Sequence, residues 1–345
     1  MTPFAAETAW TRDERGAEFW LVAIRACLEI DPDGRQSPAA EQTEVQRTPV
    51  FEGDPLTSGL LHDSDFALHK EGTDVLVEGR VYAPESRPET HCSARLKVSS
   101  VDKTLNVVGE RRLSKGLVGL SIAKPMPFLE MPLTWSRAYG GWDRKGRKEQ
   151  WEPSNPAGKG FASDPHHLDG TMAPNFEYPG EPYRGPGKCR AAAFGPVAAH
   201  WQPRLRYAGT YDKLWQETRA PLPPADFDRR HFRCAPDDQQ TQKSLVGYEE
   251  VILQGFTPQG FLGFVLPRIS FDIVTTFTRY GDIRQRPSIQ TLWLMPDLRR
   301  FEVVYASALE VPPGREEKLI GTTVFMRKQI NTLTSILRTG VWSPR

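Results

Sequence analysis

The residue types that most often bind metal ions gather in one stretch of the chain. They are His166, His167, Cys189, His200, His231 and Cys234. A His-x-x-Cys spacing can hold a metal, but a structural zinc site usually has a second close pair of ligands, and this stretch has none. The adjacent side chains of His166 and His167 point in different directions in most backbone conformations. We therefore expect no metal and no cofactor.

A cysteine nucleophile is the second chemistry that the sequence suggests. It needs a thiolate, a nearby base and an oxyanion hole. Cys189 and Cys234 have basic neighbours, which can lower the pKa of a thiol. No histidine signature accompanies them, and Cys27 and Cys92 lie in strand-like runs where a thiol usually packs as a small hydrophobic group. We expect no catalytic residues, and a metal- or cysteine-dependent hydrolase stays as an alternative.

The carboxylates and glycines of the same stretch have structural interpretations. Asp226, Asp228, Asp237 and Asp238 lack the tight alternation of oxygen ligands that calcium loops show. Asp226 follows a Pro-Pro pair and is expected to close a turn through its side-chain oxygens. Gly158-Lys159-Gly160 lacks the Gly-Lys-Ser/Thr ending of a phosphate-binding loop, so no nucleotide is expected.

The surrounding segment, residues 121–247, is rich in glycine, proline and aromatic residues. Glycine permits backbone conformations closed to other residues, proline fixes φ, and aromatic rings supply rigid contact area. This composition predicts an ordered, irregular surface that binds another protein, with Trp, Tyr and Arg as its main contacts. The candidate partner-binding residues are Arg137, Tyr139, Phe161, Trp201, Arg204, Tyr211 and Trp215. Two alternatives stay open: these aromatic residues form core, or they stack on sugars in a carbohydrate-binding β protein.

Composition excludes several classes of partner. The chain has 345 residues, a formal charge of +1 and 25% charged residues, so it has no field that recruits nucleic acid. Its apolar runs are far too short for membrane insertion, and its first ten residues have no signal-peptide pattern. The four cysteines are scattered, as is usual for reduced thiols. We expect a cytoplasmic protein.

The first third of the chain has strand texture. Residues Phe19–Ile30 are apolar and β-branched and end at a Pro-Asp-Gly turn. The remaining strands expected there are Asp74–Ala83, His91–Ser99, Lys103–Glu110 and, as a shorter candidate, Phe66–Lys70. Helix is expected to be scarce, with Glu7–Arg15 and Tyr211–Arg219 as the likeliest short pieces.

Strand texture returns after Gly247. The expected strands are Glu249–Gln254, Gly260–Leu266, Ser270–Thr278, Gln290–Met295, Arg300–Ala308 and Leu319–Met326. Met295-Pro296-Asp297 predicts a hairpin turn, and Lys328–Leu337 is a candidate short helix. The sequence thus predicts a mainly β fold with two antiparallel, sandwich-like lobes, residues 1–120 and 248–345, joined by the irregular segment 121–247.

Several blocks of the chain resemble a bacterial family known as domain of unknown function 2169. The blocks, in the family's order, are Pro127–Gly141, Asn155–Phe161, Phe194–Pro196 with Trp201, Gly209–Trp215, Asp226–Asp228 and Ala235–Gln239. The resemblance runs from about Phe19 to Tyr305. One departure is Tyr305-Ala306, where the family commonly has a Trp-Arg pair.

This resemblance implies a role in type VI secretion. Members of the family look like adaptors or chaperones that bind a toxic effector and help to load it onto the secretion spike. It therefore implies two protein partners, an effector and a spike-tip protein, and no enzymatic activity. Sequence physics alone does not indicate this role.

Overall fold

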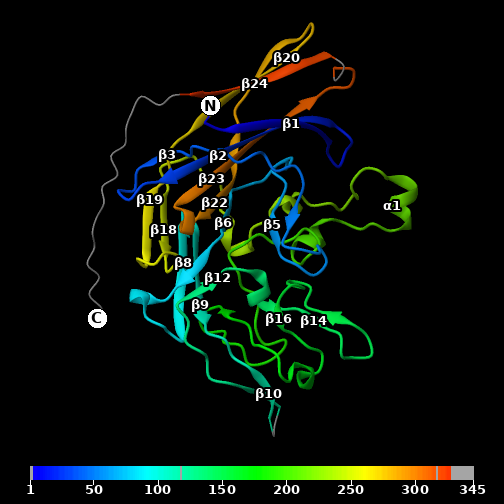
Figure 1. The fold of residues 1–345 in the computed structure, drawn as a ribbon. Helices are drawn as coiled ribbons and strands as arrows, with labels where there is room; N and C mark the ends of the chain where they lie inside the picture. The colour runs from blue at the N-terminus through cyan, green and yellow to red at the C-terminus, as the bar shows by residue number, and fades with distance from the viewer. Residues whose placement is uncertain (1–2, 117–118, 316–317, 328–345) are drawn as a thin grey trace.

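Apolar runs from both ends of the chain pair in one sheet of the computed structural model, which describes residues 3–116, 119–315 and 318–327 (Figure 1). The strand order of this first sheet is β1-β2-β23-β22-β6, and β3 pairs with β2. All neighbours are antiparallel except β22 and β6. The strands are β1 (Ala5–Arg12), β2 (Glu18–Ile30), β3 (Gln36–Pro38), β6 (Asp74–Val77), β22 (Ser288–Met295) and β23 (Arg300–Val311).

A second sheet, with strand order β17-β9-β8-β18-β19, packs against the first. Its strands are β8 (His91–Val98), β9 (Val101–Val108), β17 (Phe176–Glu177), β18 (Glu250–Gln254) and β19 (Phe261–Val265). Alternate residues of β2, such as Val22 and Ile24, join Leu96 and Leu105 of the second sheet in the main core. This alternation is what a strand with one face against another sheet requires. The predicted mainly β fold with antiparallel sheets is confirmed.

The other face of β2 is buried as well. Arg25 on this face is 3% exposed, and its guanidinium lies between the carboxylates of Asp65 and Glu302. The covering segment between β3 and β6 contains only the short pair β4 (Val50–Phe51) and β5 (Leu60–His62). Residues 66–70 are not a strand, so the prediction for Phe66–Lys70 was wrong.

The two large sheets combine strands from both predicted lobes. In the first sheet β2 pairs with β23 over its whole length, and in the second β8 pairs with β18. The changes in sequence texture near residues 120 and 247 therefore do not mark borders between sheets.

Residues 121–247 have little regular structure, as the sequence predicts. Their strands are two or three residues long. Within the segment β13 (Tyr139–Gly140) pairs with β16 (Lys159–Gly160), and β14 (Trp142–Asp143) pairs with β15 (Gln150–Trp151). Two further short strands pair with earlier parts of the chain: β11 (Leu120–Ile122) with β10 (Leu113–Lys115), and β12 (Glu130–Pro132) with β7 (Arg80–Tyr82). The α-helix in this segment is α1 (Lys213–Thr218), which confirms the expectation for Tyr211–Arg219. The 3₁₀ turns of the described chain are Pro84–Ser86, Trp135–Arg137, Pro165–Leu168, Arg204–Tyr207, Arg229–Phe232, Asp237–Gln239 and Pro296–Leu298.

Two element predictions in the first third need correction. Glu7–Arg15 is not a helix, because Ala5–Arg12 forms β1 and pairs with β2 through a turn at Gly16, whose φ is 86°. Asp74–Ala83 is not one strand, because the chain turns at Gly79, whose φ is 139°, between β6 and β7. In both places a glycine with positive φ marks the turn.

A third sheet, with order β21-β20-β24, lies at the end of the molecule beside β1 (Figure 1). Its strands are β20 (Ser270–Phe277), β21 (Gly281–Gln285) and β24 (Leu319–Arg327). The strand predicted at Leu319–Met326 is confirmed, and so is the hairpin at Pro296. The candidate helix Lys328–Leu337 lies outside the described residues. Within the described chain, no helix has the length and apolar character needed to cross a membrane.

Candidate partner-binding surface

Three of the predicted partner-binding residues are core residues. Trp201 is 0% exposed and packs edge-on against Trp135, with ring centroids 5.7 Å apart. Tyr139 is 2% exposed, and its hydroxyl accepts a hydrogen bond from the backbone of Gly187 at 2.6 Å. A partner cannot contact these side chains in the folded protein, so their assignment to a binding surface is corrected.

Arg204 is the third of these buried residues. Its guanidinium donates to the backbone oxygens of Val197 (2.6 Å) and His231 (3.0 Å) and lies 2.8 Å from a carboxylate oxygen of Asp63. A planar guanidinium whose three nitrogens each face a fixed acceptor holds separate chain segments together. Arg204 therefore stabilises the fold and does not form the rim of a binding site.

Arg137 and Phe161 are partly buried. Nη1 of Arg137 lies 2.6 Å from Oε1 of Glu110 and 3.4 Å from the side-chain oxygen of Asn175. Phe161 packs against a small satellite core that contains Tyr139 and Tyr183. Both side chains hold the irregular segment together, and neither offers a large free surface.

Tyr211 and Trp215 lie on a segment that projects from the body of the protein, residues 209–228, here called the arm (Figure 1). Asp212 caps α1 by accepting a hydrogen bond from the backbone N–H of Trp215 at 2.8 Å. The rings of Tyr211 and Trp215 meet edge to face at 4.7 Å. Tyr211 is 58% exposed and Leu214 is 66% exposed, so the arm carries large apolar side chains into solvent.

The middle of the arm, just after α1, lies against the hairpin that joins β1 and β2. Arg219 of the arm donates to the backbone oxygen of Glu14, and Arg229, next to the arm, lies 3.0 Å from the Glu14 carboxylate. Leu222 of the arm and Trp10 of β1 line a shallow cavity of about 770 Å³ between the two elements. The arm is thus fixed to this hairpin just after α1.

The residues Trp10, Tyr211, Leu214, Trp215 and Leu222 define what we call the arm surface. Trp10 is 43% exposed. The indole N–H of Trp215 donates to the backbone oxygen of Leu222 at 2.8 Å, and Leu222 lines the same cavity as Trp10, so Leu222 connects Trp10 with Trp215. Two ion pairs lie nearby: Lys213 with Glu217 at 3.6 Å on α1, and Arg12 with Glu18 at 2.6 Å beside Trp10. The side chains of the arm surface are thus apolar and aromatic, as in the core of a hydrophobic interface, and charged residues flank them.

The residues considered for metal binding lie apart. Among residues 3–116, 119–315 and 318–327, no three or more His, Cys, Asp or Glu side chains are placed to hold a metal ion. Nδ1 of His167 lies 2.9 Å from the carboxylate of Asp143, and Nδ1 of His231 lies 3.1 Å from the backbone oxygen of Arg204. His166 is exposed.

The cysteine thiols are not activated. Burial raises the pKa of Cys189 to about 12, and nearby carboxylates such as Glu177 add to this effect. Burial also raises the pKa of the Cys234 thiol, although Lys70 lies close to it. Because the thiolate is the nucleophile, a raised pKa leaves both residues in the unreactive thiol form.

The carboxylates of the segment have structural roles. Asp226 accepts hydrogen bonds from the backbone N–H and the hydroxyl of Thr210, 16 residues earlier, so it joins two distant parts of the chain instead of closing the local turn that the sequence predicts. Asp228 caps the 3₁₀ turn that follows it. Asp238 lies 2.9 Å from the buried ammonium of Lys103.

The chain was compared with protein families, curated proteins and solved structures. Residues 15–306 match the family described as "Uncharacterized protein conserved in bacteria (DUF2169)". The chain belongs to this family. No curated protein and no solved structure matches it.

Two residues of the blocks that resemble the family, Asn155 and Gly140, have structural roles in this chain. Asn155 is fully buried, and its side-chain amide donates to the backbone oxygens of Trp135 and Tyr139, both at 2.9 Å. Gly140 has a φ of 149°, and a Cβ there would lie 2.0 Å from the backbone oxygen of Asn155. Adjacent blocks thus lock each other's backbone, which explains why a segment with so little secondary structure is ordered.

Sequence reasoning missed Trp10, Leu214 and Leu222. Leu214 follows the helix cap Asp212, so its place on a short, amphipathic turn is readable from the sequence. Trp10 lies on β1, in a region that the sequence pattern predicts to be a helix. The contact of this strand with the arm joins distant parts of the chain, and no local sequence pattern indicates it.

Proposed function

We propose that this DUF2169 protein is an adaptor or chaperone that binds a toxic effector and helps to load it onto the spike of a type VI secretion system in the cytoplasm. Its partners would be the effector and a spike-tip protein. Membership of the family and the motif resemblance support this role. The observation that carries the site is the arm surface, where Leu214 on the capped helix α1 and Tyr211 just before its cap are both exposed.

The physical argument rests on how interfaces gain free energy. A few large apolar and aromatic anchors usually contribute most of the binding free energy, about 2 kcal/mol or more each on truncation. The arm surface supplies such anchors without ordering a disordered chain, because Asp212 and Asp226 already fix the backbone. With paired charges nearby, binding should change little as salt screens electrostatic attraction.

Capture experiments test this proposal. The tagged protein is expressed with the products of the neighbouring secretion genes, and retained effector is measured at low and at moderate salt. Tyr211→Ala and Leu214→Ala should each reduce capture by about tenfold or more at both salt concentrations.

Tyr280→Ala is the matched control, because Tyr280 is 44% exposed but lies on the turn between β20 and β21, on a different element from the arm. It should capture effector as the parent does. Retention of the effector by both arm variants would remove the arm surface from the proposal. Failure of the parent to retain any effector or spike protein would argue against the adaptor role itself.

One observation favours carbohydrate binding as a second candidate. The indoles of Trp142 and Trp151 stack at 4.7 Å with an interplanar angle of 30°, and Trp151 is 46% exposed. An exposed indole face is a platform on which a sugar ring can stack. Glycan-array screening of the parent and of Trp151→Ala tests this; a blank array for the parent eliminates it.

A further inference from the structure

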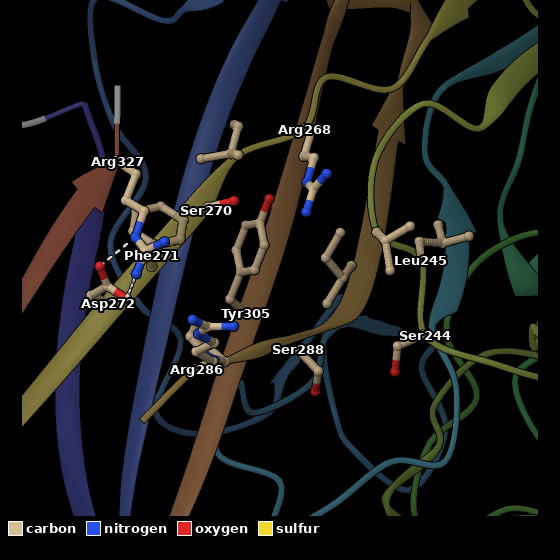
Figure 2. Close-up of a pocket in the computed structure, with 14 residues that line it drawn as sticks. Ser244, Leu245, Arg268, Ser270, Phe271, Asp272, Arg286, Ser288, Tyr305 and Arg327 are labelled. Carbon is tan, nitrogen blue, oxygen red and sulfur yellow. Dashed lines mark hydrogen bonds and ion pairs between the residues drawn. The ribbon is translucent and has the colours of Figure 1, made fainter. Parts of the chain in front are cut away.

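A pocket with cationic walls lies where the second and third sheets approach the first (Figure 2). It has a volume of about 360 Å³ and is lined by the starts of β20 and β22, by β23 and by the loop at residues 244–246. This volume lies within the range of about 300–1,000 Å³ that small-ligand sites occupy. The pocket is on different elements from the arm surface, so its function is a separate question.

The hydroxyl of Tyr305 is the unusual feature of this pocket. Tyr305 is 3% exposed, and its oxygen has no hydrogen-bond partner among the described residues. A buried tyrosine hydroxyl normally has a partner, because an unsatisfied polar group in the interior is destabilising. Figure 2 shows the ring standing in the middle of the pocket. The hydroxyl is itself buried, so a ligand in the pocket meets it only when the side chains that cover it move aside.

This hydroxyl is a hydrogen-bond donor. Burial raises the pKa of Tyr305, and the nearby carboxylate of Glu249 raises it further. The phenol thus stays protonated at neutral pH and offers its proton to an acceptor. An anionic oxygen is the acceptor that gains most from such a donor.

The charged groups around the pocket favour an anion. Three arginines line it, Arg268, Arg286 and Arg327, against one lining carboxylate, Asp272, and the carboxylate of Glu249 lies near Tyr305. Arg327 binds Asp272 through two contacts, at 2.5 Å and 2.7 Å, so this pair is neutral. Arg268 and Arg286 have no carboxylate partner among the described residues. In Figure 2, Arg268 lies on the same side of the pocket as the Tyr305 hydroxyl.

Most of the remaining lining residues are apolar, and the others are the serines Ser244, Ser270 and Ser288. Leu245, Phe271 and Ile289 are each less than 6% exposed and form the floor. A free phosphate or sulfate would leave this floor uncovered. A ligand with an apolar body and one anionic end would cover the floor and satisfy the polar groups together.

We propose that this pocket binds a carboxylate carried on an apolar body, with Tyr305 and Arg268 holding the carboxylate and Leu245, Phe271 and Ile289 contacting the body. Arg286 adds positive potential at the rim, whereas Arg327 is neutralised by Asp272. A fatty acid and the C-terminal residue of a polypeptide share this chemistry. Such a site goes beyond the proposed adaptor role, which does not require a carboxylate ligand.

Calorimetric titration of the full chain with two matched pairs of probes tests the proposal. The pairs are decanoate with decanamide, and N-acetyl-Leu-Phe as the free acid with its C-terminal amide. Within at least one pair, the acid should bind about tenfold or more tightly than the amide, because only the acid has a charge for Arg268. The pair that shows this difference identifies a fatty acid or a peptide end as the source.

Two variants locate the binding. Tyr305→Phe removes only the hydroxyl and should weaken acid binding by about fivefold or more, and Arg268→Gln should weaken it at least as much. Arg284→Gln is the matched control, because Arg284 is an exposed arginine of β21 that does not line the pocket, and it should bind as the parent does. If Tyr305→Phe does not fold, Arg268→Gln still tests the proposal, because it changes an exposed side chain.

Three results would overturn the proposal. They are equal binding of acid and amide in both pairs, unchanged acid binding by a folded Tyr305→Phe or Arg268→Gln variant, and no binding of any probe.

Discussion

Asp226 holds Thr210 by both of its carboxylate oxygens. One oxygen accepts the backbone N–H of Thr210 at 2.9 Å, and the other accepts its hydroxyl at 2.8 Å. These residues lie at the two ends of the arm, so a single side chain closes its base. The neighbouring Gly209 has a φ of 82°, and a Cβ there would lie 2.8 Å from Pro224, so only glycine allows the two ends to approach so closely.

Removal of this closure should loosen the arm and leave the sheets intact. We expect Asp226→Ala to increase the rate of tryptic cleavage at Lys213 and Arg219, because local opening exposes the backbone of the arm. The melting temperature of the protein should change little, since the arm contributes few residues to the main core.

Asp282→Ala provides the control for this experiment. Asp282 accepts a hydrogen bond from the hydroxyl of Thr276 at 2.7 Å in the β20–β21 hairpin, so the variant removes a similar exposed Asp–Thr contact elsewhere. Cleavage within the arm should stay at the parental rate. Equal cleavage of the two variants would show that Asp226 does not close the arm.

Trp201 and Trp215, which the sequence alone assigns to the same predicted binding surface, should differ in how much their truncation to alanine lowers the free energy of unfolding. Trp201→Ala should lower the free energy of unfolding by about 3–5 kcal/mol, because it leaves a large cavity in the main core. Trp215→Ala, on the arm, should lower it by about 1 kcal/mol or less. Urea denaturation followed by far-UV circular dichroism measures both. Similar losses for the two variants would contradict the division into core and arm surface.

The strands were predictable because their signals are local. Phe19–Ile30 alternates poorly but is apolar and β-branched, which is typical of a strand buried on both faces, and both faces of β2 are buried. The pairing of β2 with β23 was not predictable, because it joins residues far apart in the sequence, such as Cys27 with Glu302, which are 275 positions apart. Periodicity shows that a strand exists, but it does not identify its neighbour.

The candidate site was only partly predictable, because a local sequence pattern does not show what packs around a side chain. Tyr139 and Tyr211 lie in segments of the same composition, yet Tyr139 is 2% exposed and Tyr211 is 58% exposed. The difference comes from what packs around each ring. Tyr139 is followed by Gly140, which brings the chain against Asn155, whereas Tyr211 enters a helix that has the body of the protein on one side only.

Gly140 should tolerate no larger residue. Its φ of 149° is unfavourable for residues with a Cβ, and the added atom would lie 2.0 Å from the backbone oxygen of Asn155. We expect Gly140→Val to lower the free energy of unfolding by about 2 kcal/mol or more. Gly158→Val should have a similar effect through contacts alone, since its Cβ would lie 2.4 Å from the Asn155 amide.

Gly321→Val is the control for both glycine variants. Gly321 lies in β24 with nothing within 4 Å of its Cβ position, so valine should be neutral there or slightly stabilising. If Gly140→Val and Gly158→Val unfold at the same urea concentration as the parent, the blocks around Asn155 do not need glycine.

Asp143 should make part of the stability dependent on pH. Burial by itself raises the pKa of Asp143, but hydrogen bonds from the Ser163 side chain, from His167 and from the backbone N–H groups of Ser163 and Lys145 outweigh this effect, and the pKa lies well below its usual range. A carboxyl with a lowered pKa in the folded state stabilises the protein above its unfolded pKa of about 4, and that stabilisation is lost as the pH falls below this value. Asp143→Asn should therefore be much less stable than the parent at pH 7, and the difference should shrink between about pH 4 and pH 2.

Urea denaturation at a series of pH values measures this difference, and Asp33→Asn serves as the control. Asp33 is exposed in the turn after β2, and its side chain has no hydrogen bond to the described residues, so the control should follow the parent at every pH. The sign of the effect is the decisive part. A hydrogen-bonded carboxylate must give a stability difference that falls with acidification, whereas a residue that only fills space gives one that is independent of pH. A constant difference between Asp143→Asn and the parent would show that packing, and not the charge of Asp143, holds Ser163 and His167 in place.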